Sequence, residues 1–131
     1  MLLRRLSLLS ALAYMALLFY LSHQPTLPAP SLFEGQDKLF HAAAYGVLGV
    51  LLLGAHRLHA GGYSWRQVRS SALIASLYGM SDEIHQAFVT GRSSEFLDWA
   101  ADTVGAALAT LSLARLRRRV SPPGLAPAGA P

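Results

Sequence analysis

Four apolar runs follow one another along the chain, separated by short stretches rich in polar residues, glycine and proline. They cover residues 6–22, 37–55, 69–89 and 94–115. About 20 mostly apolar residues form a helix long enough to cross the hydrocarbon core of a membrane. The pattern therefore predicts an all-α protein, an integral membrane bundle of four helices.

The third run is the shortest in apolar length. Its uncharged part, "SSALIASLYGMS", holds 12 residues, which as a helix cover about 18 Å of a hydrocarbon core of roughly 30 Å. If this helix crosses the membrane, it has to continue through "DEIHQAFV" to about Val89. Asp82, Glu83 and His85 would then lie at or just below the outer boundary of the bilayer.

Local signals indicate where helices begin and where the domain ends. Asp37 is expected to be the N-cap of the second helix, and Ser93 or Ser94 that of the fourth, because short polar side chains accept hydrogen bonds from the first turn. Three prolines in "QPTLPAPSLFEGQ" predict an extended loop before the second helix. The end of the chain, "SPPGLAPAGAP", is typical of disorder. Residues 1–116 are expected to form the domain, and residues 117–131 a disordered cytoplasmic tail.

Composition supports a membrane protein. Of the 131 residues, 53% are hydrophobic and 14% are charged, whereas soluble domains carry about 25% charged residues. A secretory signal peptide is the alternative for residues 6–22, but this run is long for such a peptide and ends without a small-x-small cleavage site. We expect a retained helix. The chain has no cysteine, which excludes disulfides and thiolate metal sites.

Basic residues lie at the ends of the apolar runs and form no stripe, so nucleic-acid binding is not expected. Nine of the eleven lie before the first run, between the second and third, or after the fourth: Arg4, Arg5, Arg57, Arg66, Arg69, Arg115, Arg117, Arg118 and Arg119. Positively charged loops stay in the cytoplasm, so four crossings with both termini in the cytoplasm satisfy every loop. All seven acidic residues, with Lys38 and Arg92, then lie on the outer side.

Five of the seven acidic residues fall within "SDEIHQAFVTGRSSEFLDWAAD", residues 81–102. Helical spacing of three or four residues places several polar side chains on common faces. These faces are formed by Asp37, His41 and Tyr45 on the second helix, by Asp82, His85 and Gln86 on the third, and by Asp98 and Asp102 on the fourth. The predicted topology brings the three faces to one end of the bundle, where they would form one polar site.

Carboxylates at membrane depth are unfavourable, at about 2.5–3.5 kcal/mol each on insertion scales. They must be neutralised by basic partners, by a cation or by protons, and the nearby basic groups are Lys38, Arg92, His41 and His85. Solvated surface charge is the alternative interpretation. In that case the acids lie in the headgroup region, and Asp98 only stabilises the start of its helix.

The same residues include side chains that could bind a metal ion. Asp82-x-x-His85 together with His41, Asp98 or Asp102 offers oxygen and nitrogen ligands suited to zinc or manganese. No spacing matches a zinc signature, and "DEIHQ" is not the H-E-x-x-H motif. We therefore expect no bound metal and no cofactor.

Two motifs, "DKLFHAAAY" and "DEIHQAFVTGRSSEFLDWAADTVGAALA", resemble those of the VanZ-like family of small bacterial membrane proteins. The resemblance covers about residues 10–114. The matching positions are Asp37, Lys38, His41, Tyr45, Glu83, His85, Gln86, Phe88, Arg92, Asp98 and Gly105. One position departs, because the family commonly has asparagine four residues after the aspartate of the fourth helix. This chain has Asp102 there, which changes the charge of the site.

The resemblance implies a multi-pass protein of the inner (cytoplasmic) membrane that acts in the cell envelope. The named member of the family is linked to low-level resistance to the glycopeptide teicoplanin. The resemblance implies this context and no particular reaction.

Three functions are consistent with these residues. In the first, the protein binds a cell-envelope amphiphile, which is a lipid headgroup, a cell-wall precursor or a glycopeptide. The binding residues would be Asp37, Lys38, His41, Tyr45, Gln86, Arg92 and Asp102. In the second, it is an enzyme that modifies such an amphiphile, with Glu83 or Asp98 as general acid or base. His85 would transfer a proton or orient the base, and Arg92 would stabilise the negative charge of an oxyanion or phosphate. In the third, the polar residues only hold the helices together. Whether the chain forms a homo-oligomer is left open.

Overall fold

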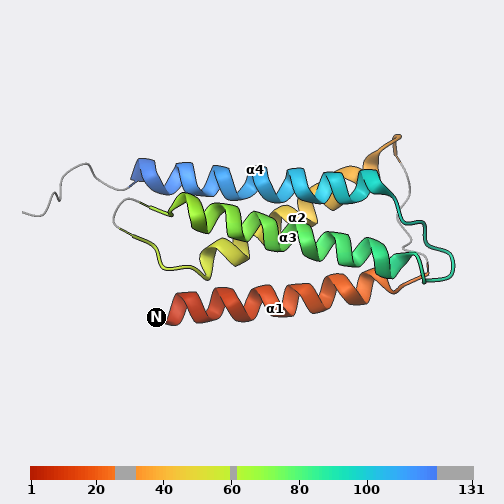
Figure 1. Ribbon diagram of the computed structural model, residues 1–131, viewed down its shortest axis with the longest axis horizontal. Coiled ribbons are helices and arrows are strands. Elements are labelled where there is room, and N and C mark those ends of the chain that lie inside the picture. The colour runs from red at the N-terminus through yellow and green to blue at the C-terminus, as the bar shows by residue number, and fades with distance from the viewer. Residues whose placement is uncertain (26–31, 60–61, 121–131) are drawn as a thin grey trace, which may run out of the picture.

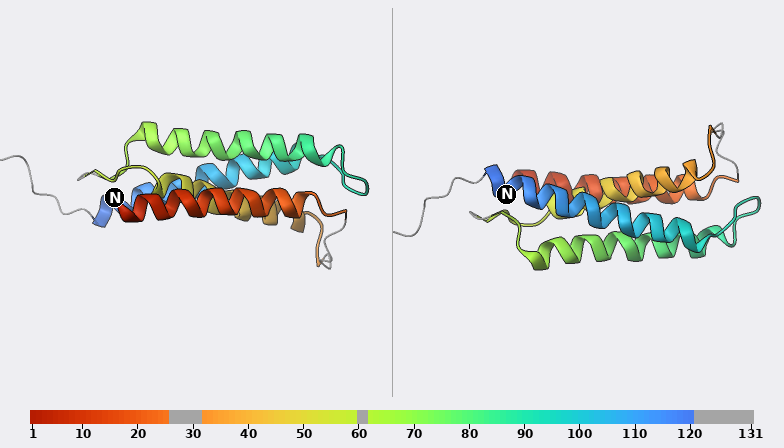
Figure 2. Two further views of the ribbon diagram at one scale, coloured as in Figure 1. Left: turned by 90° about the horizontal axis from the view of Figure 1, so that it is seen from below. Right: turned by 90° about the horizontal axis from the view of Figure 1, so that it is seen from above.

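The computed structural model describes residues 1–25, 32–59 and 62–120. Four helices run alternately in opposite directions along one elongated bundle: α1 (Leu2–Ser22), α2 (Gln36–Gly54), α3 (Trp65–Gln86) and α4 (Phe96–Val120) (Figure 1). The views from below and above show the same side-by-side arrangement of the four helices (Figure 2). The predicted all-α fold of four helices is confirmed. Helix α4 includes residues 117–120, which were expected to belong to the tail, and the remaining residues of that expected tail, 121–131, lie outside the described part.

Two helices, α1 and α2, are long and apolar enough to cross a membrane. Apolar side chains point outward along most of α1, and only Ala11, Leu18 and Ser22 are buried on this helix. An exposed apolar surface of this kind is what a lipid environment would cover. The other two helices carry more polar residues, and most of the buried polar residues lie on them.

Helix α3 differs from its predicted bounds at both ends. It begins at Trp65 because Ser64 forms a capping box: the Ser64 hydroxyl accepts from the Gln67 backbone N–H at 3.3 Å, and the Gln67 side chain accepts from the Ser64 N–H at 2.8 Å. It ends at Gln86, so the expected continuation to Val89 was wrong. With 22 residues, α3 is about 33 Å long. It reaches this length because it begins at Trp65, before the predicted start at residue 69.

The other two predicted caps also move. The N-cap of α2 is Gly35, whose positive φ of 79° suits glycine, and Asp37 lies in the first turn instead. Helix α4 begins at Phe96, later than Ser93 or Ser94 would place it. The backbone N–H groups of the first turn reach the carbonyl of Glu95.

Replacing Ser64 by alanine is expected to lower the free energy of unfolding by about 1 kcal/mol, because one N–H of the first turn of α3 loses its acceptor. Thermal unfolding of the purified protein in detergent, followed by circular dichroism, measures this change. Ser94→Ala is the matched control, since Ser94 is an exposed serine before α4 that lies outside the helix. Equal melting temperatures for the two variants would contradict the role of the cap.

Small residues let α2 and α4 approach closely, as their spacing predicts. A Cβ on Gly46 would lie 3.3 Å from the carbonyl oxygen of Gly105, and one on Gly49 would lie 3.2 Å from that of Ala106. A Cβ on Gly105 would overlap the backbone carbonyl of Ala42. This close contact fixes the position of the polar residues at the start of both helices.

Candidate functional site

The ends of α1 and α3 and the starts of α2 and α4 lie at the same end of the bundle (Figure 1). Polar side chains of α2, α3 and α4 contact one another there. The polar cluster consists of Lys38, His41, Tyr45, Asp82, Glu83, Gln86, Glu95, Asp98 and Asp102. Asp82, Glu83 and Asp98 are 6–7% exposed, and Asp102 is fully buried. The convergence of three polar helix faces, predicted from their spacing, is therefore present in the fold.

Lys38 is the basic group of one side of the cluster. Its Nζ lies 2.7 Å from Asp37, 2.7 Å from Glu95 and 2.8 Å from Asp98. Asp98 is the buried member of this trio, whereas Asp37 and Glu95 are about half exposed. One ammonium group thus joins α2 to α4 and neutralises a carboxylate that is almost entirely buried.

His41 lies between two aspartates of α4. Its Nδ1 lies 2.9 Å from Oδ1 of Asp102, and its Nε2 lies 3.9 Å from Oδ2 of Asp98. Asp102 in turn packs against Gly79 of α3, where a Cβ would lie 2.6 Å from Asp102 Oδ2. The absence of a side chain at Gly79 therefore makes the space that the Asp102 carboxylate occupies.

Two further hydrogen bonds tie α3 into the cluster. The Tyr45 hydroxyl donates to Oδ2 of Asp82 at 3.1 Å. Glu83 accepts the backbone N–H of Glu95 through its Oε2 at 2.9 Å. Each of these two carboxylates keeps a second, buried oxygen without a hydrogen-bond partner among the described residues.

A cavity of about 170 Å³ adjoins the cluster between α1, α2 and α3. Its polar lining consists of Ser22, His41, Tyr45, Asp82, Gln86 and Arg92, and apolar side chains of α1 and α2 complete the wall. Ser22 Oγ, Asp82 Oδ1 and Arg92 Nε are buried and have no hydrogen-bond partner within the described ranges. The residues that line the cavity therefore carry both donor and acceptor groups without a partner in the described structure.

His85 lies against α1 and not beside Glu83. Its Nε2 is 3.2 Å from Nδ1 of His23, and its ring centroid is 4.6 Å from that of Phe19. No contact between His85 and Glu83 or Asp98 is present among the described residues, so the role expected for His85 beside these acids stays a prediction. His23 of α1 is its partner. The spacing of four residues between Phe19 and His23 places both on one face of α1, and this spacing is visible in the sequence.

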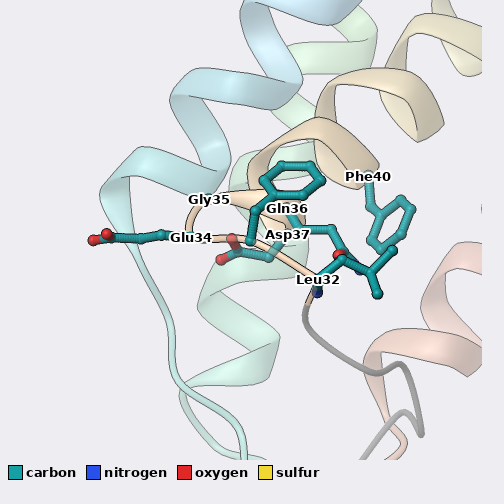
Figure 3. Close-up of a pocket in the computed structure, with 7 residues that line it drawn as sticks. Leu32, Glu34, Gly35, Gln36, Asp37 and Phe40 are labelled. Atoms are coloured by element: carbon teal, nitrogen blue, oxygen red, sulfur yellow. Dashed lines mark hydrogen bonds between the residues drawn. The ribbon is translucent and has the colours of Figure 1, made fainter.

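Another hollow, of about 520 Å³, lies at the start of α2 (Figure 3). Leu32, Glu34, Gln36 and Phe40 are among its lining residues, and the Glu34 side chain points away from the others. None of its lining residues is buried. It therefore lacks the desolvated polar groups that distinguish the cavity beside the cluster.

Comparison with known proteins identifies one match. A family model described as VanZ/LLP1 matches residues 7–117, a range that takes in nearly all of the four helices. No curated protein and no solved structure matches the chain.

Proposed function

The chain belongs to the VanZ/LLP1 family of membrane proteins, and from this premise we propose that it binds the headgroup of a cell-envelope amphiphile in the cavity between α1, α2 and α3. Three buried polar atoms of residues that line one cavity, Ser22 Oγ, Asp82 Oδ1 and Arg92 Nε, carry this proposal. Each buried polar group without a partner costs about 1–3 kcal/mol. A polar ligand that satisfies all three offsets that cost.

The proposed topology has four crossings, both termini in the cytoplasm and the cavity at the outer surface. Arginines support this orientation, because Arg4, Arg66 and Arg119 belong to helix ends opposite the polar cluster (Figure 1). Length supports it as well: α3 has 22 residues and α4 has 25, about 33 and 37 Å of helix against a core of roughly 30 Å. A headgroup at the outer surface would then meet the cavity at its own depth.

The chemistry of the cavity favours a headgroup with both signs of charge. The guanidinium of Arg92 suits a phosphate or carboxylate. Oδ1 of Asp82 needs a donor, such as an ammonium or hydroxyl group. A phospholipid headgroup that combines phosphate with an amine offers both.

The size of the cavity favours a lipid over a glycopeptide or a whole cell-wall precursor. A volume of about 170 Å³ equals that of roughly six water molecules, whereas complete small ligands occupy pockets of about 300–1,000 Å³. A small headgroup of a phosphate and an amine fits, whereas a glycopeptide or a whole cell-wall precursor does not. Leu18, Leu21 and Phe40, also in the lining, would contact the chain below it.

Replacing Arg92 by glutamine is expected to lower the retention of an amine-bearing phospholipid about tenfold or more, because a charge-assisted hydrogen bond contributes about 1.5–3 kcal/mol. Native mass spectrometry of protein exchanged into a defined lipid mixture measures the retention. Arg66→Gln, an exposed arginine at the other end of the bundle, is the matched control. Equal retention by the two variants would contradict the proposal and favour a structural role for the polar residues.

A second candidate function, a membrane-embedded enzyme, draws on the contact between His41 and Asp102. A carboxylate that holds the Nδ1–H of a histidine is the arrangement found in general-base pairs, and His41 also lines the cavity. His41→Gln would then abolish turnover of the bound amphiphile while its retention persists. In a binding protein, the phenotype and the retention would fall together.

A further inference from the structure

We propose that His41, Glu83 and Asp102 bind a divalent transition-metal cation, such as Zn²⁺ or Mn²⁺, beside the cavity. One ring nitrogen of His41 and one carboxylate oxygen from each acid lie within 4.8 Å of one another. Helices α2, α3 and α4 supply one ligand each. This trio is called the histidine trio below.

The three atoms are spaced somewhat more widely than the ligands of an occupied metal site. The ligand atoms of a tetrahedral Zn²⁺ lie about 2.0–2.2 Å from the ion and therefore about 3.4 Å from one another. The atoms of the trio lie within 4.8 Å of one another, so binding requires the wider-spaced ligands to approach by up to about 1.4 Å. Rotation of the side chains supplies a movement of this size.

Unpartnered oxygens on the two acids are the independent sign of a ligand. Glu83 is 6% exposed and Asp102 is fully buried. Each uses one oxygen in a hydrogen bond, Glu83 to the N–H of Glu95 and Asp102 to His41. The other oxygen of each, Oε1 and Oδ2, is buried without a partner in the described residues. Ionised oxygens in this state require a cation more strongly than neutral groups do.

A second trio of possible ligands in the same cluster already has a cation beside its carboxylates. Asp37, Glu95 and Asp98 also place ligand atoms within 4.8 Å of one another, and the ammonium of Lys38 lies 2.7–2.8 Å from all three. By contrast, among the described residues no lysine or arginine nitrogen lies within 4 Å of the acids of the histidine trio. With a neutral imidazole, two carboxylates and one divalent cation sum to zero charge.

The donor set selects the class of ion. Imidazole nitrogen with carboxylate oxygen suits Zn²⁺ or Mn²⁺, whereas Mg²⁺ and Ca²⁺ prefer oxygen alone. No zinc motif is visible along the chain because the three ligands lie on three different helices, 42 and 19 positions apart. The expectation of no metal, which rested on local motifs, is therefore revised by this proposal.

Metal content of the purified full-length protein tests the inference. The protein, with any affinity tag removed, is stripped with a chelator, incubated with Zn²⁺ or Mn²⁺, desalted and analysed by elemental mass spectrometry. About one ion per chain is expected for at least one of the two metals. Glu83→Gln and Asp102→Asn, which keep the shape of the side chain, should each weaken binding by at least about tenfold.

Matched controls come from the second trio, whose three carboxylates surround Lys38. Asp37→Asn and Glu95→Gln remove a carboxylate of the same kind nearby and should bind the metal as the wild type does, with unchanged helical circular dichroism. Less than stoichiometric binding of both metals by folded wild-type protein would overturn the inference. So would wild-type affinity in Glu83→Gln, or an equal loss in Glu95→Gln. Arg92→Gln should keep the metal, so the lipid and metal proposals fail independently.

Discussion

Replacing Gly105 by leucine is expected to abolish the accumulation of folded protein in the membrane. A Cβ at this position would overlap the backbone carbonyl of Ala42, and backbone atoms of two packed helices have no rotamer through which to move aside. Gly105→Ala, the smallest change, is expected to lower the free energy of unfolding by about 3 kcal/mol. Membrane abundance and thermal unfolding in detergent measure the two effects.

Neighbouring positions supply the controls for this prediction. Val104→Leu enlarges a side chain that is 55% exposed on α4 and should leave abundance unchanged. Gly46→Ala should cost less than Gly105→Ala, because its Cβ would lie 3.3 Å from the nearest atom. Normal abundance of Gly105→Leu would show that α2 and α4 pack differently.

Replacing Lys38 by methionine is expected to destabilise the protein by about 2–3 kcal/mol. The change leaves Asp98, 6% exposed, without its cation; breaking a fully buried pair costs about 3–5 kcal/mol, and Lys38 is 27% exposed, which lowers the figure. Adding Asp98→Asn should recover most of the loss, since the carboxylate that loses its cation is then neutral. Chemical unfolding of the single and double variants in one detergent measures the coupling.

Asp37 provides the control within the same trio. Its carboxylate also touches Lys38 but is about half exposed, so Asp37→Asn should change stability by less than about 0.5 kcal/mol. A double variant, Lys38→Met with Asp98→Asn, that is as unstable as the sum of the two single changes would contradict the pairing.

Periodicity was enough to predict the helices and the convergence of their polar faces. The same periodicity also indicates that Glu83 and His85 lie on different faces of α3, although they are close in sequence. Glu83 and His85 are two positions apart and therefore point about 200° from each other on a helix. An enzyme site would have His85 beside Glu83 or Asp98, yet in the structure His85 contacts His23 of α1.

Other features depend on tertiary geometry that a single sequence does not express. The capping box at Ser64 and Gln67 is a local sequence signal from which the start of α3 could be predicted. The arginines beside it favoured a loop instead. The contact of Lys38 with Glu95 and Asp98 joins residues 57 and 60 positions apart. Nothing in the spacing of either partner selects the other, because the depth and rotation of α2 against α4 are set by the glycines between them.

The distribution of charge partners between helices has a consequence for biosynthesis. Lys38, His41 and Tyr45 all lie on α2, whereas the buried acids they contact lie on α3 and α4. Helix α2 is apolar enough to enter a bilayer early, and the ribosome releases it before the acids are made. In the proposed topology, the α2 partners of Asp82, Asp98 and Asp102 are therefore synthesised before these acids, so the order of the helices along the chain lets each of the three enter the membrane beside its partner.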